Sequence, residues 1–91
     1  DFGAVFQAKE RISTAANALN GLLSLVDASS PPEVAAGVSA AQSAMAEARN
    51  HLTRGAPTRA IVAADRARRL AGDLTERLKR DRERGTQDTP G

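Results

Sequence analysis

The sequence has no cysteine, tryptophan or tyrosine, and its only aromatic residues are two phenylalanines. Without thiols, a disulfide scaffold and a thiolate metal site are both excluded. The sequence has no apolar run of about 18 residues, the length that a membrane-spanning helix requires. The single histidine, His51, cannot form a histidine cluster. We interpret His51 as a structural residue near a helix C-terminus, where the helix dipole favours its charged form.

The same scarcity argues against catalysis. A nucleophilic site requires a nucleophile, a base and an orienting group, and only one histidine could serve as the base. Carboxylates bind hard cations when several oxygens gather, and no expected loop is rich enough in them. A glycine-rich phosphate loop is also missing. We therefore expect a protein that is not an enzyme and that has no cofactor and no metal site.

Alanine is what the sequence has in abundance. Hydrophobic residues make up 41% of the 91 residues, and 19 of them are alanine, which leaves 18 larger apolar side chains. This length allows one small domain. Burying a methyl group stabilises far less than burying a leucine, so we expect a modestly stable fold that a partner or a second copy would strengthen.

Apolar residues recur at alternating spacings of three and four, which predicts three helices with a heptad-like rhythm. The first helix is predicted over 2–27, the second over 31–54 and the third over 57–84, followed by a disordered tail over 85–91. The three stripes are Val5, Ala8, Ile12, Ala15, Leu19, Leu22 and Val26; Val34, Val38, Ala41, Met45, Ala48 and Leu52; and Ala60, Ala64, Ala67, Ala71, Leu74 and Leu78.

Capping residues set the expected boundaries between the helices. Ser30 is predicted to be the N-cap of the second helix, with Pro31 at its first position and Glu33 completing a capping box. Gly55 is predicted to end that helix in the left-handed conformation, and Pro57 to begin the third.

Helices of similar length joined by short links favour antiparallel neighbours. The expected fold is an all-α, antiparallel up-down-up three-helix bundle with Ala-rich packing, forming one domain over residues 1–84. Its core is expected to be narrow in the middle and bulkier at both ends. The alternative is a long helical hairpin that dimerises into a four- or six-helix bundle.

The second helix has no charge from Val34 to Ala46. A solvent-facing helix surface usually carries charged residues, so this small-residue face is a candidate contact surface for a partner helix or a second copy. The alternative is an Ala-rich helix, favoured for its helix propensity, that binds nothing there. The candidate partner-binding residues are Ala36, Ala40, Ser43 and Ala44.

The third helix carries an arginine ridge about 37 Å long. Residues 55–91 hold nine basic and six acidic residues, whereas residues 1–54 hold four and five. The ridge is a candidate surface for an acidic protein, a membrane surface or a nucleic acid, with nucleic acid less favoured because no aromatic residue lies among the bases. The alternative is a solvated face supported by Asp65–Arg69, Asp73–Arg77 and Glu76–Arg80 pairs. The ridge consists of Arg59, Arg66, Arg69, Arg77, Arg80 and Arg84.

Residues 41–74 resemble a tetratricopeptide-type helical hairpin. Gly55, Ala60 and Ala67 stand at the spacing of that family's turn glycine and second-helix alanines, and Ala48 matches a small residue of its first helix. Glu47 stands where that family has leucine. Three-helix microtubule-interacting-and-trafficking domains share the same turn. Both families bind peptides or helices, so the resemblance implies a binding role.

These observations favour a non-enzymatic helical module that binds a partner helix or a second copy through the small-residue face of the second helix, or in the groove between the second and third helices. The first alternative is an anion-binding accessory domain that uses the arginine ridge. The second is a structural extramembrane domain of a larger anchored protein, because the chain begins at Asp1 without methionine and is expected to be a processed form or a piece.

Overall fold

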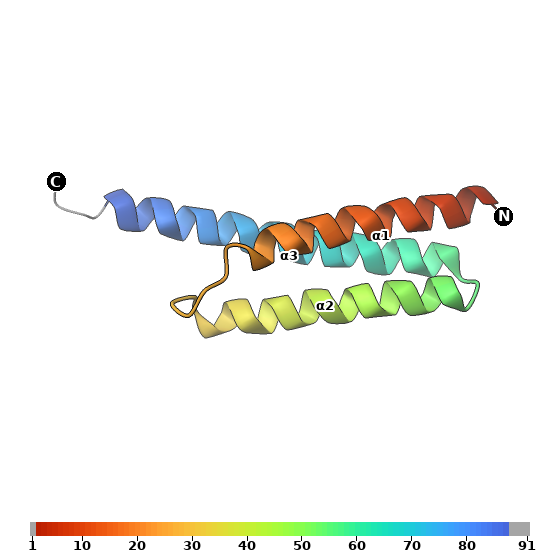
Figure 1. Ribbon diagram of the computed structural model, residues 1–91, viewed down its shortest axis with the longest axis horizontal. Helices are drawn as coiled ribbons and strands as arrows, with labels where there is room; N and C mark the ends of the chain where they lie inside the picture. Colours follow the sequence, from red (N-terminus) through yellow and green to blue (C-terminus); the bar gives the residue numbers. More distant parts are fainter. Residues whose placement is uncertain (1, 88–91) are drawn as a thin grey trace.

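The computed structural model describes the backbone of residues 2–87 and the side chains of residues 2–84. Over these residues the chain forms three helices and no strand: α1 (Phe2–Leu23), α2 (Pro32–Thr53) and α3 (Pro57–Gln87). Successive helices run in opposite directions (Figure 1). The all-α, up-down-up three-helix bundle predicted from the sequence is therefore confirmed.

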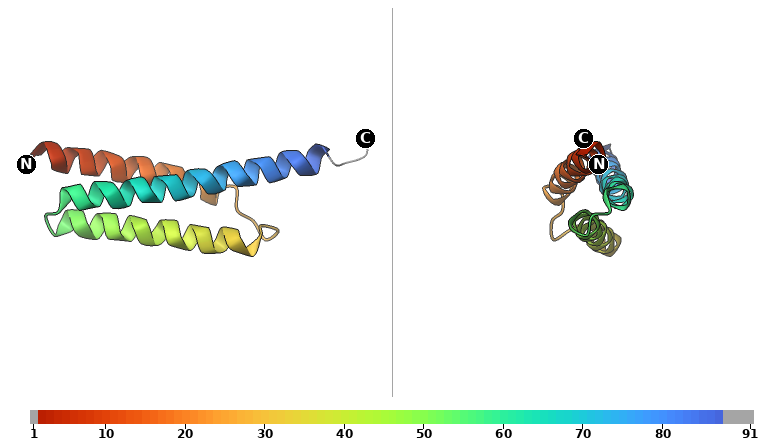
Figure 2. Two further views of the ribbon diagram at one scale, coloured as in Figure 1. Left: turned by 180° about the vertical axis from the view of Figure 1, so that it is seen from behind. Right: turned by 90° about the vertical axis from the view of Figure 1, so that its right-hand side faces the viewer.

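The longest helix, α3, packs along both of the others, whereas α1 and α2 contact each other less. Two further views show α1 and α2 resting on α3 from two sides (Figure 2). The bundle is elongated, with extents of 59 × 21 × 15 Å. Its third helix extends past the other two, and Lys79–Arg84, which follow the buried Leu78, are exposed. The two interfaces that α3 forms with α1 and with α2 are thus the main packing interfaces of the molecule, and we call them the seams of α3.

Alanine forms most of the core. Ten of the fifteen buried hydrophobic residues are alanines, and α3 alone contributes Ala60, Ala63, Ala64, Ala67 and Ala71. Four of the larger buried side chains come from the end of α1, the start of α2 and the second half of α3, which meet at one end of the bundle: Leu19, Leu22, Val34 and Leu78. Met45 is buried in the middle of α2. The predicted bulk is therefore buried at one end, whereas Val5, Leu52 and Ile61 at the other end are only half-buried.

The loop between α1 and α2 starts earlier than the spacing of the apolar residues predicts. Helix α1 ends at Leu23 rather than residue 27, although Val26 still packs against the core. Ser30 is not the N-cap of α2. Its hydroxyl accepts a hydrogen bond from the backbone N–H of Asp27 at 3.0 Å, and Pro31 occupies the cap position without a side-chain hydrogen bond. The polar residues of this loop thus bond with one another rather than with the helix.

The carboxylate of Asp27 organises this loop. It accepts hydrogen bonds from the hydroxyl of Ser29 at 2.6 Å and from the Ser29 backbone N–H at 2.9 Å. These bonds favour the charged form, so they hold the pKa of Asp27 below its ordinary value of 3.8. The guanidinium of Arg82 on α3 lowers this pKa further.

Loss of the Ser29 hydroxyl is expected to raise the pKa of Asp27 towards 3.8. A depressed folded-state pKa contributes stability that is present above pH 3.8 and is lost as the pH falls through the folded-state value. A pH titration of the Asp27 carboxyl carbon by NMR checks this in the native chain and in Ser29→Ala. An unchanged midpoint in the variant would contradict the assignment of Ser29 as the main cause, and Ser24→Ala serves as a control.

The boundary between α2 and α3 follows the prediction closely. Gly55 has a φ of 80°, and its side-chain-free backbone allows this left-handed turn. Its N–H donates to the carbonyl of Leu52 at 3.1 Å, and Pro57 opens α3. Helix α3 continues through residues 85–87, which were predicted to belong to the tail, and the rest of that predicted tail, 88–91, lies outside the described residues.

Ion pairs between described side chains join α3 to each of its neighbours. Arg11 on α1 lies 3.0 Å from Asp65, and Glu33 on α2 lies 3.7 Å from Arg77. The sequence predicted pairs within α3, among them Asp65 with Arg69 and Asp73 with Arg77. The structure pairs Asp65 and Arg77 between helices, because both residues flank the seams that α3 forms with its neighbours. Exposed pairs of this kind contribute about 0–1 kcal/mol, so they align the helices more than they stabilise them.

Candidate functional site

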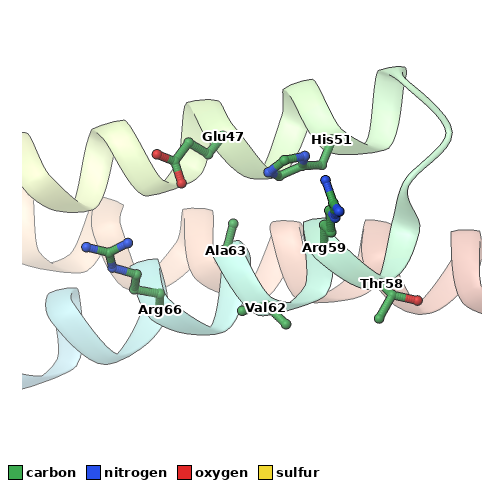
Figure 3. Close-up of a pocket in the computed structure, with 7 residues that line it drawn as sticks. All are labelled: Glu47, His51, Thr58, Arg59, Val62, Ala63 and Arg66. Atoms are coloured by element: carbon green, nitrogen blue, oxygen red, sulfur yellow. The ribbon is translucent and has the colours of Figure 1, made fainter.

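A cavity of about 260 Å³ lies between the second half of α2 and the first half of α3. Figure 3 shows Glu47 and His51 on α2 and Arg59 and Arg66 on α3 at this cavity, with Val62 and Ala63 between the two arginines. We call this site the α2–α3 groove. Its lining residues are Glu47, His51, Thr58, Arg59, Val62, Ala63 and Arg66.

Val62 is one of the large apolar side chains that the described surface exposes, together with Phe2, Phe6 and Leu23, and it is the one that lines this cavity. Its side chain is 66% exposed, while its neighbour Ala63 is buried against the core. Val62 stands between Arg59 and Arg66 on the polar side of α3, a position where a solvated helix usually carries a charged residue. The groove therefore presents an apolar side chain flanked by two guanidinium groups.

A heptad series defines the side of the groove formed by α2. Residues seven apart lie on nearly the same side of a helix, and Glu33, Ala40 and Glu47 follow this spacing. Glu33 pairs with Arg77 of α3, and Glu47 lines the cavity. Ala40, which is exposed, therefore lies between them on the side of α2 that faces α3.

The four predicted partner-binding residues do not form one surface. Ala44 is only 3% exposed and belongs to the core, so its assignment to a contact surface is wrong. It lies too close to the seam with α3 to face solvent. Ala36 and Ser43 are exposed, further round the helix from α3 than Ala40. None of the four lines the cavity, and Ala40 lies closest to it in direction, one heptad before Glu47 on the side of α2 that faces α3.

The six arginines of the predicted ridge are all exposed, but the structure divides them. Arg59 and Arg66 line the α2–α3 groove. Arg77 pairs with Glu33, and with Arg80 and Arg84 it lines a separate, more polar cavity of about 410 Å³. Asp73 and Asp81 also line that cavity and offset part of its positive charge. Arg69 lines neither of these two cavities.

The chemistry of the groove suits binding. Two arginines and one glutamate surround an apolar floor, and the groove is open along one side (Figure 3). Within the part of the chain that the structure describes, no group of three or more histidine, aspartate or glutamate residues is placed to hold a metal ion. The arrangement offers an apolar contact together with guanidinium donors for carboxylates or phosphates.

Sequence reasoning missed Val62, Glu47 and Thr58 as residues of the site. A signal for Val62 was present, because a β-branched apolar residue between two arginines one heptad apart interrupts the polar side of α3. Thr58 gave no such signal. Its place in the groove depends on the short Gly55 turn, which brings the start of α3 against the end of α2.

Comparisons with protein-family models, with curated proteins and with solved structures found no match for this chain. The resemblance of residues 41–74 to a tetratricopeptide-type hairpin is thus not matched by a family model. Among the described residues, no helix combines the length and the apolar character that crossing a membrane demands.

Proposed function

We propose that this chain is a non-enzymatic interaction module that binds a partner helix in the α2–α3 groove. The observation that carries this proposal is Val62, an apolar side chain 66% exposed beside a cavity of about 260 Å³. A helix that buries Val62 would remove this apolar surface from water, and full burial of a valine is worth about 1.5 kcal/mol or more.

Small residues on α2 support a helix as the occupant. Ala40 allows the backbone of an incoming helix to approach α2 more closely than a long side chain would. Two parallel ridges with a floor between them are the shape in which an amphipathic helix packs, with apolar anchors every three or four residues. Ala36 and Ser43, exposed on the outer side of α2, extend this uncharged surface beyond Ala40.

Substitution of Ala40 tests the proposal. The probe is a designed 21-residue helical peptide (about 32 Å long) with one Leu/Ala stripe and glutamine elsewhere. It is titrated into the chain and followed by fluorescence anisotropy. Ala40→Arg is expected to weaken binding at least about tenfold, which is about 1.4 kcal/mol, because a helix long enough to pass the cavity would also cover α2 one heptad before Glu47, where the long charged side chain would stand.

Ala46→Arg is the matched control. Ala46 is also exposed, and by helix geometry it lies about 120° round α2 from Ala40, away from α3. This variant should bind like the native chain, and circular dichroism should show equal helicity in both variants. Equal binding by Ala40→Arg and the native chain would contradict the proposal. Sedimentation equilibrium of the chain alone determines whether the chain self-associates, as it would if a second copy occupied the groove.

A further inference from the structure

We propose that the partner helix is amphipathic and carries acidic residues along the edge that faces α3. This inference rests on the proposed function and concerns the same groove. The charge of the groove supports it, because its lining contains two arginines on α3 and a single glutamate on α2. Carboxylates placed beside Arg59 and Arg66 could each accept two charge-assisted hydrogen bonds from one guanidinium group.

The nearest acidic residue of α3 does not offset this charge. Asp65 directly precedes Arg66 in the sequence, but its carboxylate lies 3.0 Å from Arg11 of α1, on the other seam of α3. Arg59 and Arg66 are exposed and lie on the opposite seam, at the cavity shared with α2. The α3 side of this groove is therefore basic, although α3 as a whole carries both signs of charge.

Spacing makes a helix a suitable source of the carboxylates. Arg59 and Arg66 are seven residues apart, which places them about 10 Å apart along α3. Two acidic residues one heptad apart on an incoming helix have the same separation. Val62 lies between the two arginines, so the apolar stripe of that helix would contact Val62 while its acidic edge lies over α3.

A second copy of the chain matches this groove less well. Glu47 is the one acidic residue in the groove, so two facing grooves would set four arginines against two glutamates. A nucleic acid also matches less well. Val62 and Ala63 offer nothing to a phosphate, Glu47 repels it, and the lining has no aromatic side chain on which a base could stack.

The experiment compares three versions of the designed peptide. All share the Leu/Ala stripe, and the residues along one edge are glutamine, glutamate or lysine. The native chain is expected to bind the glutamate peptide at least about tenfold more tightly than the lysine peptide at low salt. This preference should shrink as salt is raised, because exposed charges are screened.

Two double variants test whether Arg59 and Arg66 cause the preference for the glutamate peptide. Arg59→Gln with Arg66→Gln should abolish the preference for the glutamate peptide while the affinity for the glutamine peptide stays within about twofold. Arg49→Gln with Arg68→Gln removes the same charge from exposed positions that do not line the groove and should keep the preference. A preference that survives the Arg59/Arg66 double substitution would overturn the assignment.

The remaining outcomes separate the two proposals. Equal binding of the glutamate and lysine peptides, with the Ala40→Arg effect intact, would overturn the acidic partner and leave the helix-binding function standing. Binding of none of the three peptides would overturn the helix-binding function itself. A 22-base-pair DNA duplex serves as the competing probe. If it bound more tightly than the glutamate peptide and lost affinity in the Arg59/Arg66 variant, it would identify the groove as a nucleic-acid site.

Discussion

Replacement of Leu22 by alanine is expected to lower the free energy of unfolding by about 2–5 kcal/mol, a large fraction of the roughly 5–15 kcal/mol that holds a small domain together. Leu22 is fully buried and is one of the two largest side chains that are completely enclosed. It lies at the end of the bundle where Leu19, Val34 and Leu78 are also buried, so its removal would leave a cavity inside the part of the core with the largest side chains. The cost includes both the lost apolar burial and this cavity.

The neighbouring residue provides the control. Leu23 is 40% exposed, and Leu23→Ala removes the same atoms one position further along α1. This variant should lose well under half as much stability as Leu22→Ala. Urea unfolding followed by circular dichroism measures both, and equal losses would contradict the packing assigned to Leu22. For a domain of this size, each kcal/mol lost corresponds to a fall of about 4–8 °C in the melting temperature.

The fold could be predicted from the sequence because heptad spacing and burial coincide. Ala8, Ala15, Leu19 and Leu22 were placed on one side of the first helix by spacing alone, and all four are buried. The same holds for the alanines of α3. In a helix as polar as α3, alanines at every third or fourth position mark the side that packs into the core. Their periodicity therefore predicted the buried side of α3 even without large side chains.

The loop between α1 and α2 could not be predicted in the same way. Ser30 followed by two prolines and Glu33 has the composition of a capping box, but composition does not determine which polar group the serine hydroxyl contacts. In the structure the hydroxyl of Ser30 bonds to the N–H of Asp27, and Glu33 reaches Arg77 across the seam with α3. Both contacts depend on tertiary positions that a local pattern does not contain.

The candidate site shows the same limit. Spacing on a single helix identified the uncharged surface of α2 and the arginines of α3 as separate candidates. Only the packing of the two helices places Ala40 near the same groove as Arg59 and Arg66, and only packing removes Ala44 to the core. The groove between the second and third helices could be proposed from the expected fold, but the residues that line it could not, because its lining belongs to two helices at once.

The alanines that form the core also set the depth of the groove. Because α3 presents alanine to both neighbours, its backbone can lie close to α2, and Ala63 is at once part of the core and part of the groove floor. Val62, the next residue back along α3, is consequently held at the surface. Core packing and the shape of the α2–α3 groove are therefore coupled through the distance between α2 and α3.

Ala67→Leu tests this coupling. Ala67 is fully buried in the middle of α3, and three added carbon atoms in this tightly packed seam are expected to cost about 1–3 kcal/mol of unfolding free energy. Ala46→Leu adds the same atoms at an exposed position of α2 and should change stability by less than about 0.5 kcal/mol. Thermal unfolding compares the two variants. If α2 and α3 separate to accommodate the leucine, Ala67→Leu should also weaken binding of the glutamine peptide, although Ala67 does not line the groove. A stable Ala67→Leu variant with native affinity would show that close packing of alanines does not set the geometry of the α2–α3 groove.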